Sequence, residues 1–163
     1  MSPVTIARAT PQVARAQAEW IAATEPWRGL GYRAAALGTW LGRMAGDGDG
    51  HGEIWVARAG GRAPVSGIVV VQDGVLLGGF VALVAVKSTE AGRGIGRALM
   101  TAVEARVFSR RRWLYVSADS DNRPALGFYR KLGFARVGRL PDLIKPGRVE
   151  VLLRKGADGA APR

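Results

Sequence analysis

The sequence contains no cysteine and a single histidine, His51. The missing thiols exclude disulfide bonds, thiol nucleophiles and thiolate metal sites, and one histidine does not make a histidine-rich metal centre. We therefore expect no bound metal. Because a chain without disulfides suits a reducing compartment, the expected location is the cytoplasm.

Long apolar runs are missing as well. No stretch approaches the roughly 20 apolar residues that a membrane-spanning helix needs. The first residues also lack the charged start and apolar run of a signal peptide. These absences predict a soluble protein that has neither a targeting segment nor a membrane partner.

Acidic residues are scarce, at 13 against 24 lysines and arginines, which gives a formal net charge of +11. Most arginines are scattered along the chain, and only Arg110 to Arg112 form a run. A nucleic-acid module is expected to gather charge on one face and to interleave exposed aromatic residues. We therefore expect no nucleic-acid partner, with RNA binding through that run kept as a minor alternative. The charge also suits the electrostatic steering of an anionic small molecule.

The length of 163 residues and the 48% hydrophobic content suit one domain with a substantial core. We place this domain at residues 1–155 and expect a disordered tail at 156–163. The pattern of the first half predicts an early strand, a helix with Thr10 as N-cap, and a second helix that ends in the glycine-rich loop 46–52. Three further strands follow, and Asp73-Gly74 predicts a tight hairpin between the last two. The expected strands are 4–9, 53–59, 65–72 and 75–86, and the helices are 10–24 and the segment around 37–44.

The second half predicts a helix over 94–109, a strand over 113–118, a short helix over 124–132 and strands over 134–137 and 149–154. Gly133 stands where a left-handed cap would end the short helix. The helix over 94–109 connects the strand ending at Val86 to the strand starting at Trp113, so these two strands should be parallel neighbours. The predicted fold class is α/β, with a mixed sheet of about seven mostly antiparallel strands and about four helices.

The most informative segment runs from Leu83 to Leu99, where an apolar strand enters a turn with three alternating glycines and then a helix. Glycines adopt backbone conformations closed to other residues, and the start of the helix offers unsatisfied N–H groups and a positive dipole end. This arrangement predicts a phosphate ligand. Neither the P-loop motif nor the dinucleotide fingerprint occurs here, so both nucleotide readings fail. The alternative is that the glycines only let the strand turn into the helix.

The segment from Ala91 to Gly96 resembles the pyrophosphate loop [QR]xxGx[GA] of the GNAT superfamily of N-acetyltransferases, with Ala91 in place of Gln or Arg. A second block resembles the pattern Nx₂Ax₃Yx₂LGF of the same family. It matches at Asn122, Ala125, Tyr129, Leu132, Gly133 and Phe134. The resemblance covers about Val65 to Arg154 and is specific because both blocks occur in the right order.

The resemblance implies acetyl-CoA as co-substrate, bound where the central parallel strands part. Backbone groups of the strand would bind the pantetheine arm, and the glycine segment would hold the pyrophosphate. Asn122 and Ala125 would lie along the lower pantetheine and the acetyl end. The implied ligand residues are Val84, Ala85, Val86, Gly92, Arg93, Gly94, Ile95, Gly96, Arg97, Asn122, Ala125 and Tyr129. For Val84 and Val86, core packing is the plain alternative, and both roles are compatible.

The resemblance also implies that Tyr129 protonates the departing CoA thiolate while a primary amine attacks the thioester directly. From its helical spacing alone, Tyr129 could equally be a core aromatic residue. The rival to an enzyme is a non-catalytic CoA-binding domain that senses or scaffolds.

Two parts of the implied reaction stay open in the sequence. Many relatives use a glutamate on the strand before the loop as the catalytic base. The segment from Val75 to Val86 has no acidic residue, so no base is assigned. The candidates are Glu25, Glu53, Asp121, Asp142 and His51. For the wall that selects a small-molecule or peptide amine, we expect Glu25, Trp27 and Tyr32, and the alternative is that the tryptophan anchors a loop onto the core. Asp121, with Asp119 at the end of the opposite strand, would attract a cationic amine to the same substrate site. Homodimers are frequent in the family, and no sequence feature fixes the oligomeric state.

Overall fold

The computed structural model describes residues 3–46 and 51–159. Its strands form a seven-stranded mixed sheet in the order β1-β2-β3-β4-β5-β7-β6. The predicted fold class is therefore confirmed, including the parallel neighbours β4 and β5. The strands are β1 (Val4–Arg8), β2 (Gly52–Ala59), β3 (Val65–Val75), β4 (Gly78–Val86), β5 (Trp113–Asp119), β6 (Ala135–Pro141) and β7 (Val149–Gly156).

The helices are α1 (Pro11–Arg15), α2 (Ala18–Ala22), α3 (Ala34–Ala45), α4 (Ile95–Phe108) and α5 (Arg123–Lys131), with a 3₁₀ turn η1 (Ser88–Glu90) before α4. Thr10 caps α1 as predicted, because its side chain accepts a hydrogen bond from the Val13 N–H at 3.3 Å. The prediction of one helix over 10–24 is wrong. The helix tightens at Gln17, whose N–H bonds to the Ala14 carbonyl and whose buried side chain binds the Val13 carbonyl and the Trp20 indole.

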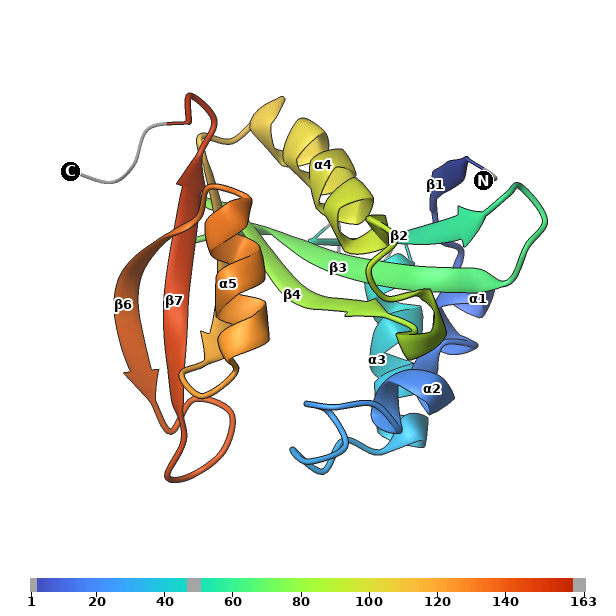
Figure 1. Cartoon of the computed structure of the whole chain (residues 1–163), viewed down its shortest axis with the longest axis horizontal. Coiled ribbons are helices and arrows are strands. Elements are labelled where there is room, and N and C mark those ends of the chain that lie inside the picture. The colour runs from blue at the N-terminus through green and yellow to red at the C-terminus, as the bar shows by residue number, and fades with distance from the viewer. Residues whose placement is uncertain (1–2, 47–50, 160–163) are drawn as a thin grey trace. The chain divides into compact units, whose positions relative to one another are not determined.

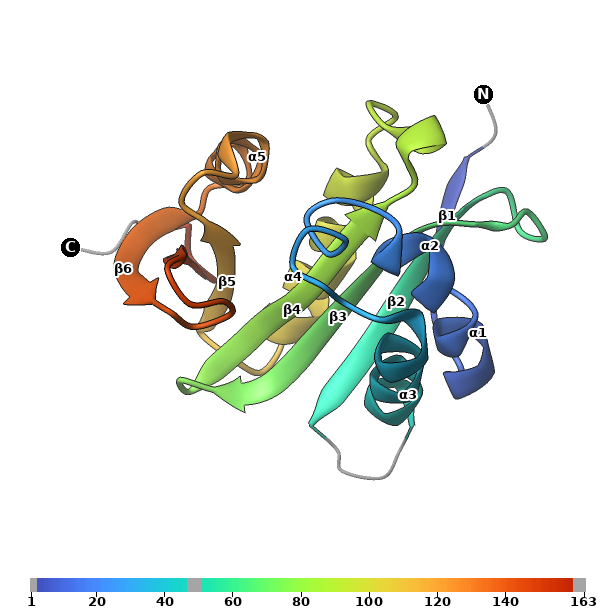
Figure 2. The ribbon, with the colours of Figure 1, turned by 90° about the horizontal axis from the view of Figure 1, so that it is seen from below.

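Two compact units make up the chain, and each is described by itself. The first comprises Met1–Gln72 and Leu83–Val103, and the second comprises Asp73–Ala82 and Glu104–Arg163. In the first unit, β1, β2 and β3 pair antiparallel. Figures 1 and 2 show α3 and α4 on opposite faces of these strands. Gly67 on β3 allows α4 to approach, because a Cβ there would lie 2.8 Å from the Ile95 side chain.

In the second unit, a parallel ladder joins Gly79, Phe80 and Val81 of β4 to Leu114, Tyr115 and Val116 of β5. The other neighbouring strands of this unit, β5 with β7 and β7 with β6, pair antiparallel. Figure 1 shows α5 alongside β6 and β7. Gly78 makes a close strand approach possible, because a Cβ there would lie 2.5 Å from the Trp113 carbonyl oxygen.

The hairpin between β3 and β4 does not turn at Asp73-Gly74, so that prediction is wrong. The left-handed residues at its tip are Leu76 and Leu77, with φ angles of 49° and 62°. Both leucines are exposed, at 59% and 85%. Gly74 has a φ of 79° inside β3. Asp73 instead anchors the hairpin through a bidentate ion pair with Arg111. The Arg111 Nε lies 2.9 Å from one carboxylate oxygen of Asp73, and its Nη2 lies 3.1 Å from the other.

The end of the chain continues in an ordered form past the predicted boundary at 155. Gly156 is the last residue of β7, and the Ala157 N–H donates to the Arg112 carbonyl at 2.9 Å. The remainder of the expected tail, residues 160–163, lies outside the described residues.

Candidate functional site

The first unit carries the end of β4 and the glycine loop. Along β4, Leu83 and Ala85 are buried, while Val84 and Val86 are half-buried, as expected for a strand with one face on the core. The Lys87 N–H donates to the Ser66 carbonyl of β3 at 2.9 Å, which fixes the point where the chain leaves the sheet. The start of the glycine loop is therefore attached to the sheet through β4 and this hydrogen bond.

The glycine loop has the backbone that its sequence predicts. Gly92 and Gly94 have φ angles of 75° and 76°, in the left-handed region that favours glycine. A Cβ at either position would meet nothing within 4 Å, so the loop has open space beside it. Arg93 forms an ion pair with Glu90, and Arg97 is exposed in the first turn of α4.

Ile95 ties this loop to the core, because its side chain is only 2% exposed at the first position of α4. The first-turn N–H groups of α4 have no preceding helical carbonyl to bind, and the helix dipole makes this end positive. An open loop that ends on a helix N-terminus is a suitable place for a phosphate group.

The acceptor-wall candidates of the first unit lie in the segment between α2 and α3. Glu25 accepts hydrogen bonds from the Arg28 side chain at 2.9 Å and from the Gly29 N–H at 3.0 Å. The bond with Arg28, followed by the bond with Gly29, lowers the pKa of Glu25. Trp27 accepts a backbone bond from the Tyr32 N–H at 3.1 Å, and Tyr32 is 40% exposed. Glu25 thus organises its own turn, which makes it a poor proton acceptor.

The second unit carries the other motif block on α5. Asn122 is the N-cap of α5, where its side chain accepts a hydrogen bond from the Ala125 N–H at 3.2 Å. Pro124 stands in the first turn, where its missing N–H costs no helical bond. Gly133 follows the helix with a φ of 94°, so the predicted cap is confirmed. Two of the motif positions in this block, Asn122 and Gly133, therefore shape the ends of the helix itself.

Tyr129 lies on the buried face of α5, with 5% of its surface exposed. Its ring meets Phe128 and Phe134 edge to face, with centroids 5.3 and 5.8 Å apart. Burial, and after it the negative charge of Glu150, raises the pKa of Tyr129 well above its ordinary value. The hydroxyl therefore keeps its proton at neutral pH.

The turn between β5 and α5 is built from two aspartates and an arginine. Asp119 accepts bonds from the Asp121 N–H and the Arg148 Nε, both at 2.8 Å, and Arg148 also lies 3.6 Å from Asp121. Burial opposes ionisation of Asp119, but these two bonds outweigh it and lower the pKa of Asp119. Asp121 has a mostly exposed side chain, at 79%.

Sequence reasoning missed Glu150, the second residue of β7, which is only 7% exposed. The hydroxyl of Ser117 donates a hydrogen bond to its carboxylate. Burial, and next the charge of Asp119, raises the pKa of Glu150 against the opposing effects of Ser117 and Arg148. A glutamate inside the apolar run VEVLL is the signal that could have identified it.

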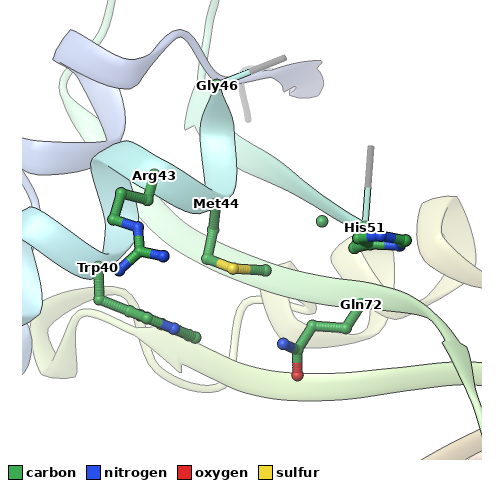
Figure 3. Close-up of a pocket in the computed structure, with 7 residues that line it drawn as sticks. Trp40, Arg43, Met44, Gly46, His51 and Gln72 are labelled. Atoms are coloured by element: carbon green, nitrogen blue, oxygen red, sulfur yellow. The ribbon is translucent and has the colours of Figure 1, made fainter. Parts of the chain in front are cut away.

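The remaining base candidates from the sequence are Glu53, Asp142 and His51. Glu53 is buried in β2, and Asp142 accepts a bond from the Gly147 N–H at 2.7 Å in a surface turn. His51 lines a cavity of about 250 Å³ in the first unit (Figure 3). The other lining residues are Trp40, Arg43, Met44, Gly46, Gly52 and Gln72. Apart from the base candidate His51, none of the sequence-predicted cofactor or catalytic residues lines this cavity.

Within residues 3–46 and 51–159, no three His, Cys, Asp or Glu side chains are grouped so that they could hold a metal ion. Over the same residues, no helix is long and apolar enough to cross a membrane.

Residues 14–134 of the chain match the Acetyltransferase (GNAT) family. The match covers well over half of the sequence, so the chain belongs to the GNAT acetyltransferase family, whose members are acyltransferases. Among curated proteins, none matches the chain at the level of sequence.

Solved structures show the same fold. An N-acetyltransferase from Staphylococcus aureus Mu50 is 15% identical, with a TM-score of 0.75 over 96% of this chain and 99% of its own. An aminoglycoside 6'-N-acetyltransferase complexed with coenzyme A is 18% identical, with a TM-score of 0.74 over 98% of both chains. A nourseothricin acetyltransferase is 25% identical, with a TM-score of 0.61 over 67% of both chains.

Proposed function

We propose that this chain is an N-acetyltransferase that moves an acetyl group from acetyl-CoA to a primary amine. The observation that carries the proposal is the loop between β4 and α4 in a GNAT chain. Gly92 and Gly94 take left-handed backbone angles there, and the space beside both is open. A pyrophosphate needs this combination of bare backbone, room and a positive helix end.

In the proposed complex, backbone groups of Val84, Ala85 and Val86 bind the pantetheine arm. The pyrophosphate lies against the loop, bound by Gly92, Arg93, Gly94, Ile95, Gly96 and Arg97. Asn122 and Ala125 line the acetyl end. Acetyl-CoA supplies the activated acyl group as a thioester, and the protein supplies binding, orientation and proton transfer.

Tyr129 is the proposed general acid. The position of Tyr129 in the motif block of α5 supports this role, and its raised pKa keeps the hydroxyl protonated at neutral pH, so that the proton is present when the thiolate departs. A thiolate has an ordinary pKa of about 8.5 and leaves more readily when a proton is supplied.

The proposed acceptor is a primary amine on a small molecule or a peptide, and the proposed setting is the cytoplasm, with the enzyme as a homodimer. The names of two structural neighbours, an aminoglycoside 6'-N-acetyltransferase and a nourseothricin acetyltransferase, support testing aminoglycoside-like polyamines first.

Thermal unfolding with and without acetyl-CoA tests the binding half of the proposal. A ligand that binds only the folded state stabilises it by about 2.7 kcal/mol at 100 times its Kd, so the melting temperature should rise by several degrees. An amine panel followed by free-thiol release then tests turnover. A melting shift without thiol release from any amine would favour a non-catalytic CoA-binding domain, and no shift at saturation would contradict both functions.

A further inference from the structure

The two basic residues of β7, Arg154 and Lys155, have partners other than Glu150. Side chains alternate along β7, so Glu150, Leu152 and Arg154 share one face, and Lys155 lies on the other. Lys155 forms an ion pair with Glu104 of α4 at 2.8 Å. The Arg154 guanidinium stacks on the Trp113 ring at 3.9 Å. Both cations of β7 are therefore engaged elsewhere.

The two neighbouring strands place Glu150 among a defined set of groups. It pairs in register with Asp119 of β5 on one side and with Leu140 of β6 on the other. The Ser117 hydroxyl, two residues before Asp119, donates to the Glu150 carboxylate. The ion pairs of Arg148 are with Asp119 and Asp121.

The charge of Glu150 also reaches Tyr129 of α5, where it is the second cause of the raised pKa after burial. The ionisable groups that act on Glu150 or respond to it are thus Asp119, Arg148 and Tyr129, and Asp121 acts in turn on Arg148. Their arrangement gives the second unit a buried carboxylate within electrostatic range of the proposed general acid. Glu150 is 7% exposed, and its carboxylate accepts a hydrogen bond from the Ser117 hydroxyl. An ionised carboxylate has about four lone-pair sites, so this bond leaves sites that can accept a proton.

We propose that Glu150 is the base that removes the proton from the acceptor ammonium, with Ser117 holding its carboxylate in position. This inference rests on the proposed acetyltransferase function and adds the base that the sequence left unassigned. The register places the Glu150 carboxylate beside that of Asp119, and the negative charge of this pair would attract a cationic amine.

In the proposed reaction, the acceptor nitrogen loses two protons, one to Glu150 and one to Tyr129. The ammonium of the acceptor gives one proton to the Glu150 carboxylate, which later returns it to water, and the neutral nitrogen forms the new C–N bond. The C–S bond of the thioester breaks, and the thiolate takes the Tyr129 proton. The nitrogen then loses its second proton, which restores the Tyr129 hydroxyl. The net products are an amide, the free thiol and one proton.

The raised pKa of Glu150 supports this role, because it narrows the gap to an alkylammonium, whose pKa is about 10.4. Removing the base should therefore matter most where little of the amine is neutral. For Glu150→Gln we expect kcat/KM to fall by about 10²- to 10⁴-fold at pH 7, the usual range for a general base. The deficit should shrink as the pH rises towards the pKa of the amine.

The test measures kcat/KM from pH 6 to 10 with an amine that the wild type acetylates, drawn from a panel of an aminoglycoside, a polyamine, a lysine-containing peptide and amino acids. Glu104→Gln is the matched control, since it makes the same change in a half-buried carboxylate of the same unit. Its kcat/KM should stay within about twofold. The melting shift with acetyl-CoA should persist in both variants and shows that each is folded.

Ser117→Ala provides an independent arm. The lost hydrogen bond lowers the pKa of Glu150 in the wild type, so its removal should move the acid limb of kcat/KM to higher pH. An unchanged acid limb in Ser117→Ala, or a Glu150→Gln profile within threefold of wild type at every pH, would overturn the assignment of Glu150 alone. A wild type that binds acetyl-CoA and acetylates no amine overturns the acetyltransferase function itself, and the role of Glu150 with it.

Discussion

The glycine loop of the first unit and the Tyr129 region of the second handle charge in opposite ways. The loop is exposed and offers backbone groups at Gly92 and Gly94, with the exposed side chains of Arg93 and Arg97 nearby in sequence. The Tyr129 region is buried, and its polar atoms belong to side chains whose pKa values are raised by burial. The difference teaches that binding a permanently charged phosphate needs geometry and room, whereas moving a proton needs a side chain withdrawn from water.

The largest expected effect separates the two regions directly. In Tyr129→Phe, kcat should fall by about 10²- to 10⁴-fold because the proposed proton donor is lost, while the acetyl-CoA melting shift should remain. Free-thiol release and thermal unfolding measure the two quantities. Tyr115→Phe is the control, because Tyr115 is a buried tyrosine of the same unit at 7% exposure, and its kcat should change less than twofold. Equal losses in both variants would remove the special role of Tyr129.

A change in the loop should have the opposite signature. In Gly94→Val, the φ of 76° becomes strained by about 1–2 kcal/mol, which corresponds to roughly a tenfold rise in the KM for acetyl-CoA if the strained loop loses its shape. The kcat at saturation should stay within about threefold.

Gly61→Val serves as the loop control, since a Cβ there is unobstructed and its φ is not left-handed. A fall in kcat with an unchanged KM in Gly94→Val would contradict the division between binding loop and catalytic region.

The smallest expected effect concerns the Asp73–Arg111 ion pair of the second unit. Its loss should lower thermal stability and leave acetyl-CoA binding and turnover unchanged. The hydrogen bond from Arg111 lowers the pKa of Asp73. A carboxylate with a lowered folded pKa contributes stability above its unfolded pKa of about 3.9 and loses it as the pH falls through the folded value. Asp73→Asn should therefore lower the melting temperature by about 2–4 °C at pH 7 and by less as the pH falls below about 4.

Thermal unfolding across this pH range measures the effect. Adding Arg111→Gln to Asp73→Asn should cause little further loss at pH 7, because the two residues share one interaction. Additive losses would show that each residue stabilises the unit separately.

Local chemistry explains what the sequence could predict. Thr10, Asn122 and Gly133 act on their own helix ends, so their roles follow from residues three or four positions away. The parallel neighbours β4 and β5 follow from the handedness and length of the helical crossover.

The errors arise where several local preferences compete. Asp73-Gly74 is a strong turn signal, yet Asp73 has a partner in Arg111, 38 residues away, and the turn falls on Leu76-Leu77. Glu150 was overlooked because its position in an apolar strand gives no sign that Ser117 and Asp119 lie beside it. A contact between distant strands cannot be deduced from the period of one of them.

The chain passes between its two units at three places, after Gln72, after Ala82 and after Val103. Each crossing falls inside a continuous element, namely β3, β4 or α4. Neither unit is therefore a cassette that a truncation could release, because every cut at a border severs a strand or a helix. For the same reason, we expect that neither unit can be expressed alone or exchanged with that of another protein. The glycine loop and Tyr129 therefore have to be kept in one intact chain.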